Sequence, residues 1–169
     1  MRQRFRGTST HKVDDKGRVS IPAEFRRVLD ALDPDRDPGT QPRVHILFGD
    51  TREPWLTCHS MSSIDEIAEL LDEMDESDPA LPVLEAYYFG HAETVTLDPS
   101  GRLVLSKQLR DRAGIETKGE ATFLAMGKTF RIHSPDAPAE AVDPLQARLA
   151  ELGDAPVRSL LPRKRRAAE

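Results

Sequence analysis

The residues best suited to chemistry in this chain of 169 residues are an aspartate, a glycine and an arginine that occur together twice. The two sets are Asp14, Gly17 and Arg18, and, 84 residues further along, Asp98, Gly101 and Arg102. An arginine presents five N–H donors in a planar fork, which can pair with phosphate oxygens or with the O6 and N7 atoms of guanine. Glycine favours a turn because it adopts positive φ without strain, and the aspartate then supports the turn or orients the arginine. The pattern indicates a repeated element that binds a polyanion.

A structural interpretation of the same residues is the alternative. The aspartate can simply cap its own turn while the arginine forms a surface ion pair that contributes little. The presence of the arginine in both copies favours binding, because a dispensable side chain is expected to drift in at least one copy. Lys16 adds a point charge suited to phosphate in the first copy, whereas Ser100 replaces it in the second. We therefore expect the first copy to lead in binding and the second mainly to complete the fold and the assembly.

Other basic residues lie towards the two ends of the chain. Arg4 and Arg6 precede the first copy and could extend its contact with an anionic partner, although a charged terminus is equally ordinary. The basic run at residues 163–166 either adds non-specific attraction to nucleic acid or only solubilises the tail.

The distribution of charge matters more here than the net charge of −5. No lysine or arginine occurs between Glu53 and Gly101, and acidic residues fill the centre of that stretch, from Asp65 to Asp78. An acidic face elsewhere on the molecule is compatible with a basic face that approaches DNA, since the local potential governs that approach. The alternative is an oligomeric interaction or scaffold protein that does not bind DNA and presents the acidic central helix to a partner.

The sequence favours a binding protein over an enzyme. The five histidines are scattered without the spacing of metal ligands, and Cys58 is the only cysteine. No phosphate-binding glycine loop, nucleophile elbow or dinucleotide fingerprint is present. We expect no catalytic residue, no metal site, no cofactor and no small-molecule substrate.

The size of the chain favours two small domains that need each other or further copies. A domain of about 60 residues buries only about 60% of its unfolded surface, so packing between the halves or a homo-oligomer would stabilise it. No apolar run approaches the roughly 18 residues of a membrane span, and a lone cysteine suits a reducing compartment. We expect a cytoplasmic protein without a membrane partner.

The periodicity of apolar residues places the two sets on turns between short strands. In each copy a strand, the turn, a second strand, a short helix and a hairpin follow one another. The expected segments are strands around residues 5–13 and 18–21, a helix from Pro22 to Leu29, a hairpin at 43–58, helices at 62–74 and 84–89, strand-turn-strand at 93–105, a helix at 107–113 ended by Gly114, and a hairpin at 122–133. Ser63 and Glu66 match a capping box for the central helix.

These segments divide the chain into four parts. We assign residues 1–60 to the first repeat, 61–85 to a linker helical region, 86–133 to the second repeat and 134–169 to a partly ordered tail with a basic end. Phe89 stands 84 residues after Phe5 and takes the corresponding place in the second repeat.

Residues 4–133 resemble the MraZ family in the right order. The resemblance is carried by Phe5-Arg6-Gly7-Thr8, by the segment from Val13 to Pro22, by Phe25-Arg26, by Tyr88-Phe89 and by the segment from Leu97 to Leu103. It implies an α+β fold, mostly β, of two AbrB/SpoVT-like swapped-hairpin units with short helices, related by a pseudo-twofold axis and assembled into rings of identical subunits.

The resemblance also implies a function. Members of this family are bacterial transcriptional regulators of the division and cell-wall gene cluster, and they bind tandem G-rich promoter repeats as homo-oligomers. By resemblance, this chain would be a nucleoid-associated repressor that binds double-stranded DNA. Arg18 and Lys16 would contact DNA, Arg102 would be the matching arginine, and Asp14, Gly17, Asp98 and Gly101 would support the two turns.

Overall fold

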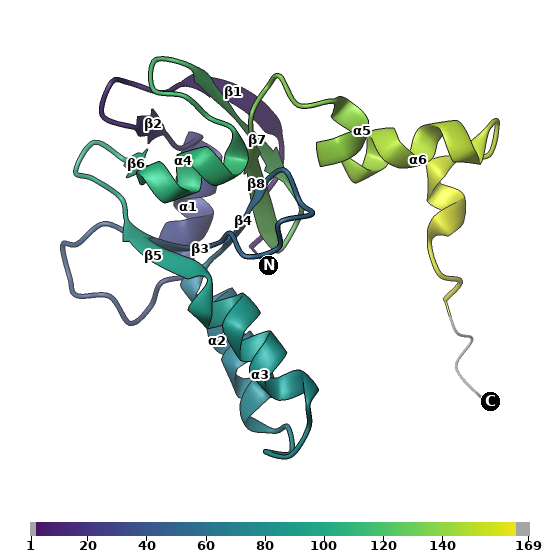
Figure 1. Ribbon diagram of the computed structural model, residues 1–169, viewed down its shortest axis with the longest axis horizontal. Coiled ribbons are helices and arrows are strands. Elements are labelled where there is room, and N and C mark those ends of the chain that lie inside the picture. The colour runs from purple at the N-terminus through teal and green to yellow at the C-terminus, as the bar shows by residue number, and fades with distance from the viewer. Residues whose placement is uncertain (1–2, 165–169) are drawn as a thin grey trace.

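The strands of the two sequence repeats interleave in one antiparallel sheet of six strands (Figure 1). In the computed structural model, which describes residues 3–164, the strand order is β1-β7-β8-β4-β3-β5. The bounds are β1 Thr8–Lys12, β3 Arg43–Leu47, β4 Leu56–His59, β5 Ala92–Thr96, β7 Glu120–Ala125 and β8 Thr129–His133. The first strand of each repeat therefore pairs with the hairpin of the other repeat, and the fold is α+β and mostly β, as expected.

The order of this sheet is symmetric under exchange of the two repeats. The first repeat contributes β1, β3 and β4, and their counterparts in the second are β5, β7 and β8. If each strand is replaced by its counterpart, the order becomes β5-β3-β4-β8-β7-β1. This is the original order read from the other edge of the sheet. The centre of symmetry lies between β4 and β8, which pair antiparallel with Cys58 opposite Phe130.

A separate two-stranded ribbon carries the two turns. It consists of β2, Arg18–Ser20, and β6, Arg102–Val104, which pair antiparallel. Each short strand thus pairs with the corresponding strand of the other repeat, and an isolated bridge between Val13 and Val19 also joins β2 to the residue that follows β1. Backbone hydrogen bonds from Leu105 N–H to the Gly17 carbonyl, 2.9 Å, and from Ile21 N–H to the Gly101 carbonyl, 3.4 Å, extend this pairing at both ends.

The core joins the ribbon, the sheet and two short helices. Helices α1, Ala23–Ala31, and α4, Lys107–Ala113, follow β2 and β6, and they bury Phe25, Leu29 and Leu109. Gly114 ends α4 in the left-handed conformation, as predicted. Phe5, Phe25, Phe123 and Phe130 form an aromatic cluster with edge-on and tilted contacts.

A helical arm projects from the body (Figure 1). It consists of α2, Met61–Asp72, α3, Ala80–Glu85, and one turn of π-helix, Ala86–Gly90. The predicted helix is confirmed, but the predicted capping box at Ser63 is wrong: the Ser60 hydroxyl accepts the Ser63 N–H at 3.1 Å and caps α2. Ser60 follows β4 directly and is fully buried, so it ends the strand and begins the helix in one residue.

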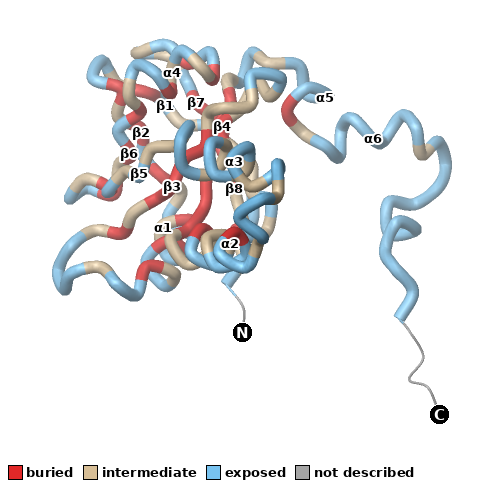
Figure 2. The backbone as a smooth tube through the Cα atoms, turned by 60° about the horizontal axis from the view of Figure 1, so that its bottom comes forward, coloured by how far each residue is buried: buried red, intermediate tan, exposed pale blue. Residues whose placement is uncertain are grey.

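The chain ends in a projecting helical tail (Figures 1 and 2). It comprises α5, Ala139–Val142, α6, Pro144–Leu152, and a short 3-10 turn, Val157–Leu160. Burial is concentrated in the body of the molecule, whereas most of the arm and the tail is exposed. Val142 is the exception in the tail, because only 2% of it is exposed and its carbonyl accepts a hydrogen bond from Arg131 at 2.8 Å.

The two repeats differ at their first aromatic residue. Phe5 is buried in the aromatic cluster and its N–H bonds to the Gly127 carbonyl at 2.7 Å. Phe89, its counterpart by sequence, lies in the π-helical turn and is 44% exposed. The arm therefore breaks the symmetry at the start of the second repeat.

Candidate nucleic-acid interface

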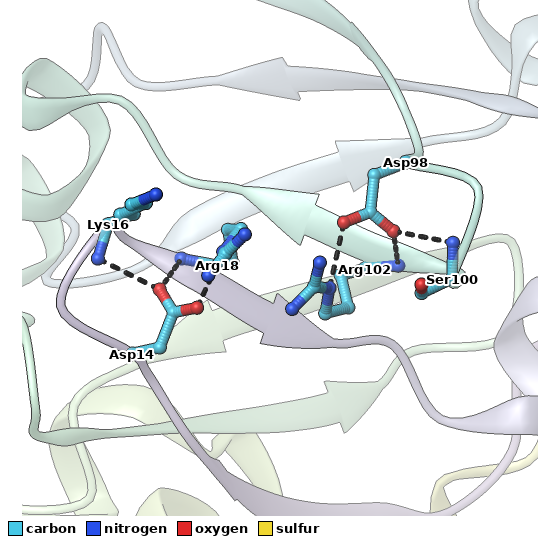
Figure 3. A network of polar contacts seen from close by, with 6 residues as sticks. All are labelled: Asp14, Lys16, Arg18, Asp98, Ser100 and Arg102. Carbon is cyan, nitrogen blue, oxygen red and sulfur yellow. Dashed lines mark hydrogen bonds and ion pairs between the residues drawn. The ribbon is translucent and has the colours of Figure 1, made fainter.

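The first turn is held by both oxygens of one carboxylate (Figure 3). Asp14 Oδ1 accepts the backbone N–H groups of Lys16, at 2.9 Å, and Arg18, at 2.8 Å. Asp14 Oδ2 accepts the Nε–H of the Arg18 guanidinium at 2.6 Å. The Asp14 N–H also bonds to the Arg18 carbonyl at 2.9 Å, which closes the loop. The four-residue spacing is therefore needed so that one side chain can reach both the turn and the arginine.

The second turn repeats this network atom by atom (Figure 3). Asp98 Oδ1 accepts the N–H groups of Ser100 and Arg102, each at 2.9 Å, and Asp98 Oδ2 accepts Arg102 Nε–H at 2.8 Å. Gly17 and Gly101 have φ of 78° and 73°, the left-handed region that the turn requires. The sequence left open whether the aspartate supports the turn or orients the arginine, and in the structure its carboxylate accepts hydrogen bonds from both.

These contacts favour the charged form of each carboxylate. Partial desolvation would raise the pKa of Asp14, but hydrogen bonds from the Arg18 backbone and guanidinium and from the Lys16 backbone lower it overall. The pKa of Asp98 is lowered chiefly by the Arg102 backbone N–H, with a further contribution from the Arg102 guanidinium. Each arginine is thus paired with an ionised carboxylate that orients its guanidinium.

Both arginines lie on the outward face of the ribbon. Val19 and Leu103 point into the core, with 1% and 0% exposed, so the alternation of side chains along a strand sends Arg18 and Arg102 to the opposite face. In the register Arg18 is opposite Val104 and Arg102 is opposite Ser20, which makes the two arginines diagonal neighbours. Diagonal neighbours are roughly 7–8 Å apart in such a pair of strands, and their β-carbons are somewhat closer.

Each guanidinium keeps donors available for a ligand. The carboxylate engages Nε, and within residues 3–164 neither Nη1 nor Nη2 of Arg18 or Arg102 donates a hydrogen bond to another group. The side chains are 30% and 33% exposed, so their ends reach the surface while their stems are held. Such an arrangement presents a planar pair of N–H groups in a fixed orientation.

The structure brings some of the other predicted residues to this face and separates others from it. Lys16 and Ser100 are exposed in the two turns. Arg4 and Arg6 lie instead beyond the opposite end of β1, since Phe5 bridges to Gly127 whereas Val13 bridges to Val19. Eight extended residues span about 26 Å, so these two arginines are remote from the ribbon of their own subunit. Of the basic run in the tail, Arg165 and Arg166 lie outside the described residues.

Two further arginines pack against the turns, and the sequence analysis did not predict this role for them. Arg110, on α4, lies against the first turn: its Nε–H donates to the Leu105 carbonyl at 3.1 Å, and a side chain at Gly17 would meet it. Arg26, on α1, lies in the same way over Gly101. Arg26 and Arg110 are 84 residues apart, which is also the offset between the two turns. Comparison of the two repeats could therefore have identified them as a matching pair. Unlike Arg110 Nε, Arg26 Nε makes no hydrogen bond: among the described residues it is a buried donor without a partner.

Two features that the described residues lack bear on other functions. Residues 3–164 contain no group of three or more histidine, cysteine, aspartate or glutamate side chains placed to hold a metal ion. In the same part of the chain, no helix has the length and apolar character needed to cross a membrane.

Comparison with known proteins identifies the family. No family model matches the chain. A transcriptional regulator MraZ from Ruegeria sp. (strain TM1040) is 44% identical over 136 residues, which cover 80% of each chain. The transcriptional regulator MraZ of Ruegeria pomeroyi is 44% identical over 135 residues, again 80% of each chain. That of Xanthobacter autotrophicus is 34% identical over 148 residues, 88% of this chain and 83% of the relative. With this level of identity over most of both chains, the protein belongs to the MraZ family of transcriptional regulators.

Proposed function

We propose that this protein binds double-stranded DNA through the outward face of the β2–β6 ribbon and represses transcription of a bacterial division and cell-wall gene cluster. The observation that supports the proposal is the placement of Arg18 and Arg102 together on that face, each held by its aspartate through Nε. A two-stranded ribbon fits the major groove of B-DNA, which is about 12 Å wide. The names of the relatives support regulation of transcription as the context.

The chemistry of base recognition follows from the free ends of the arginines. The two terminal nitrogens of a guanidinium can donate in parallel to O6 and N7 of one guanine, the commonest specific contact in the major groove. Because each guanidinium is oriented by a carboxylate before DNA arrives, less side-chain entropy is lost on binding. Two such arginines at neighbouring positions favour a G-rich site.

The two turns are proposed to contribute unequally. The exposed Lys16 ammonium in the first turn suits a DNA phosphate, whereas Ser100 in the second turn carries no charge. Arg18 and Lys16 therefore contribute more to the affinity for DNA than Arg102 does.

Assembly would convert a weak contact into a tight one. One ribbon offers few base contacts, so several ribbons held at fixed spacing in a homo-oligomer would gain effective concentration on tandem promoter repeats. This is the role we propose for a ring of subunits.

A gel-shift titration on the DNA upstream of the chain's own gene, with shuffled DNA as the reference, tests the proposal. Replacing Arg18 by alanine should weaken binding to the upstream DNA by about 10-fold to 100-fold, the cost of one bidentate base contact, and bring it to the level of shuffled DNA. Arg102→Ala should have a smaller effect in the same direction.

Arg52 provides a matched control. It is also paired with an aspartate two residues away, Asp50, but it is 88% exposed in the β3–β4 loop rather than on the ribbon. Arg52→Ala should leave the affinity unchanged. Equal affinity of the wild type for both DNAs would overturn the proposal. If charge reversal at Glu69 or Glu73 abolished binding to a protein partner while Arg18→Ala did not, the molecule would be an interaction protein using its acidic helix.

A further inference from the structure

Val104 differs from the other apolar residues of the ribbon because it faces outward. It ends β6 and is 41% exposed, whereas Val19, Leu103 and Leu105 are 1%, 0% and 1% exposed. The alternation that buries Leu103 sends Val104 to the outward face, where Arg102 also lies. A single exposed valine is ordinary on a protein surface, so the position of Val104 within the candidate interface is what makes it informative.

Val104 lies directly across the ribbon from Arg18. The Leu105 N–H bonds to the Gly17 carbonyl at 2.9 Å, on the outer side of this pair, so Arg18 and Val104 form a non-hydrogen-bonded pair of the antiparallel ladder. The β-carbons of such a pair are about 4.5–5.5 Å apart, the closest approach between neighbouring strands. The isopropyl group of Val104 therefore stands next to the arginine whose Nε is held by Asp14.

The second arginine of the ribbon has a different neighbour. Arg102 lies opposite Ser20, which is exposed and whose hydroxyl can donate or accept a hydrogen bond. Ser20 and Val104 are 84 residues apart and so occupy matching places in the two repeats. One half of the outward face therefore combines an arginine with an apolar group, and the other half combines an arginine with a hydroxyl.

The chemistry of the major groove favours thymine as the base that meets a valine. Thymine presents its C5 methyl group there, whereas the other bases present nitrogen and oxygen donors and acceptors. A valine set against those polar edges would remove water from them without replacing its hydrogen bonds. Successive base pairs are about 3.4 Å apart along the DNA axis. Two side chains whose β-carbons are about 5 Å apart can therefore contact neighbouring base pairs.

We infer that Val104 contacts the C5 methyl group of a thymine in the base pair next to the guanine that Arg18 contacts, and that it thereby determines part of the sequence specificity. The inference rests on the proposed binding of DNA by the ribbon and adds a second base to it. DNA is favoured over the subunit's own tail as the partner that covers Val104, because the ribbon and the tail lie on opposite sides of the body in both views (Figures 1 and 2). Ser20 has no apolar group to offer, so the half of the ribbon around Arg102 does not recognise the methyl group.

Removal of single methyl groups from the DNA tests the inference. The DNA upstream of the chain's own gene is prepared with each thymidine replaced in turn by deoxyuridine, which pairs in the same way and lacks only the methyl group, and affinities are measured by fluorescence anisotropy. At a thymine next to a guanine, the wild type should lose affinity by about 4-fold, the equivalent of one buried methyl group. Val104→Ser, which installs the residue found in the other repeat, should bind the unmodified DNA more weakly and should show equal affinity for the two DNAs.

Two control variants change the same kinds of residue outside the contact. Val83→Ser alters a valine of the arm that is 67% exposed, and Ser20→Ala alters the matching position of the ribbon. Both should keep the wild-type ratio of affinities for thymine and deoxyuridine DNA, and circular dichroism should show that all variants are folded. If the wild type bound every DNA equally while Arg18→Ala still abolished specific binding, the inference would be overturned and the proposed function would stand. Unchanged affinity in Arg18→Ala would overturn both. A wild-type ratio in Val104→Ser would overturn the inference alone, and a change in its sedimentation would then assign Val104 to a contact between copies of the chain.

Discussion

Each turn of the ribbon uses one aspartate for two tasks. The carboxylate accepts backbone N–H groups at the second and fourth residues that follow it, which shapes the turn, and it also accepts the arginine Nε–H. Since a carboxylate has two oxygens, the turn occupies one and the guanidinium the other. The conformation of the turn and the orientation of the arginine are thus coupled, and a change in either disturbs both.

Gly17 should be the least replaceable residue of the first turn. A β-carbon there would lie 2.7 Å from the Leu105 carbonyl oxygen, in addition to the strain of φ 78°. We expect Gly17→Ala to lower the free energy of unfolding by about 2–4 kcal/mol, because backbone strain and a clash with the paired strand add. Gly39→Ala is the matched control: its φ is 81°, but no atom lies within 4 Å of the added carbon. It should cost only about 1 kcal/mol in urea unfolding. Equal losses would show that the close approach to the Leu105 carbonyl is unimportant.

Residues within one turn could be predicted from the sequence, whereas those that act between turns could not. Asp14, Gly17 and Arg18 are local, and their spacing indicates the turn directly. Arg26 and Arg110 act on the turn of the other repeat, so their role depends on how the two ribbon strands meet. Ser60 was missed as the cap of α2 for a related reason, since it is fully buried at the junction with β4.

At the scale of elements, the sequence predicts the strands and helices but not their partners. Alternating apolar residues locate β1, β2, β5 and β6, and the glycine turns between them suggest local strand pairs. The pairing of β2 with β6 instead involves residues 82 to 86 positions apart, and that of β1 with β7 residues 108 to 116 positions apart. The interleaving was implied only by the resemblance to the MraZ family, because periodicity reports which face is buried and not which strand lies beside it.

The helices α1 and α4 should stabilise the ribbon to different extents. Arg110 Nε–H bonds to the Leu105 carbonyl, whereas Arg26 Nε is buried without a partner. Arg110→Met keeps much of the apolar stem but removes the bond, and we expect a loss of about 1 kcal/mol in the free energy of unfolding. Arg26→Met should cost less, since it also removes a buried unsatisfied donor. Thermal and urea unfolding of the pair compare the two directly, and a larger loss for Arg26→Met would contradict this account.

The base of the arm should make the protein sensitive to mild acid. His59 is 7% exposed, its Nδ1 hydrogen bonds to the Ser63 hydroxyl at 3.0 Å, and burial, with a smaller effect of His45, lowers its pKa to about 4. In the unfolded chain the pKa is near 6.5, so between pH 6.5 and 4 only the unfolded state takes up the proton. The free energy of unfolding should therefore fall by up to about 3 kcal/mol as the pH drops through this window.

Variants at two histidines separate this effect from other acid effects. His59→Asn should flatten the dependence between pH 6.5 and 4 measured by urea unfolding, and His91→Asn, at an exposed position, should keep the wild-type slope. The lowered pKa values of Asp14 and Asp98 affect stability only below about pH 4, where their stabilising contacts are lost. An unchanged slope in His59→Asn would show that the arm does not control acid stability.

Charge is distributed unevenly over the whole molecule, and the acidic residues are concentrated in the arm. Residues 61–90 have nine acidic residues and no lysine or arginine, residues 163–166 form a basic run, and Arg18 and Arg102 are diagonal neighbours on the ribbon. A net charge of −5 therefore does not describe what DNA would encounter at the ribbon. The acidic arm would repel DNA and restrict its approach to other faces of the molecule.

Exchange of the two turn residues tests whether the repeats are unequal on DNA. Lys16→Ser should weaken binding to specific and shuffled DNA alike and reduce the slope of log affinity against log salt by about 1 for each ribbon engaged, because one phosphate contact is lost. Ser100→Lys should raise that slope by a similar amount if the second turn lies as close to the backbone as the first. Fluorescence anisotropy titrations across a series of salt concentrations measure both slopes. Unchanged slopes for Ser100→Lys together with a reduced slope for Lys16→Ser would mean that only the first turn reaches phosphate, whereas no change in either would exclude the ribbon turns from contact with the backbone of DNA.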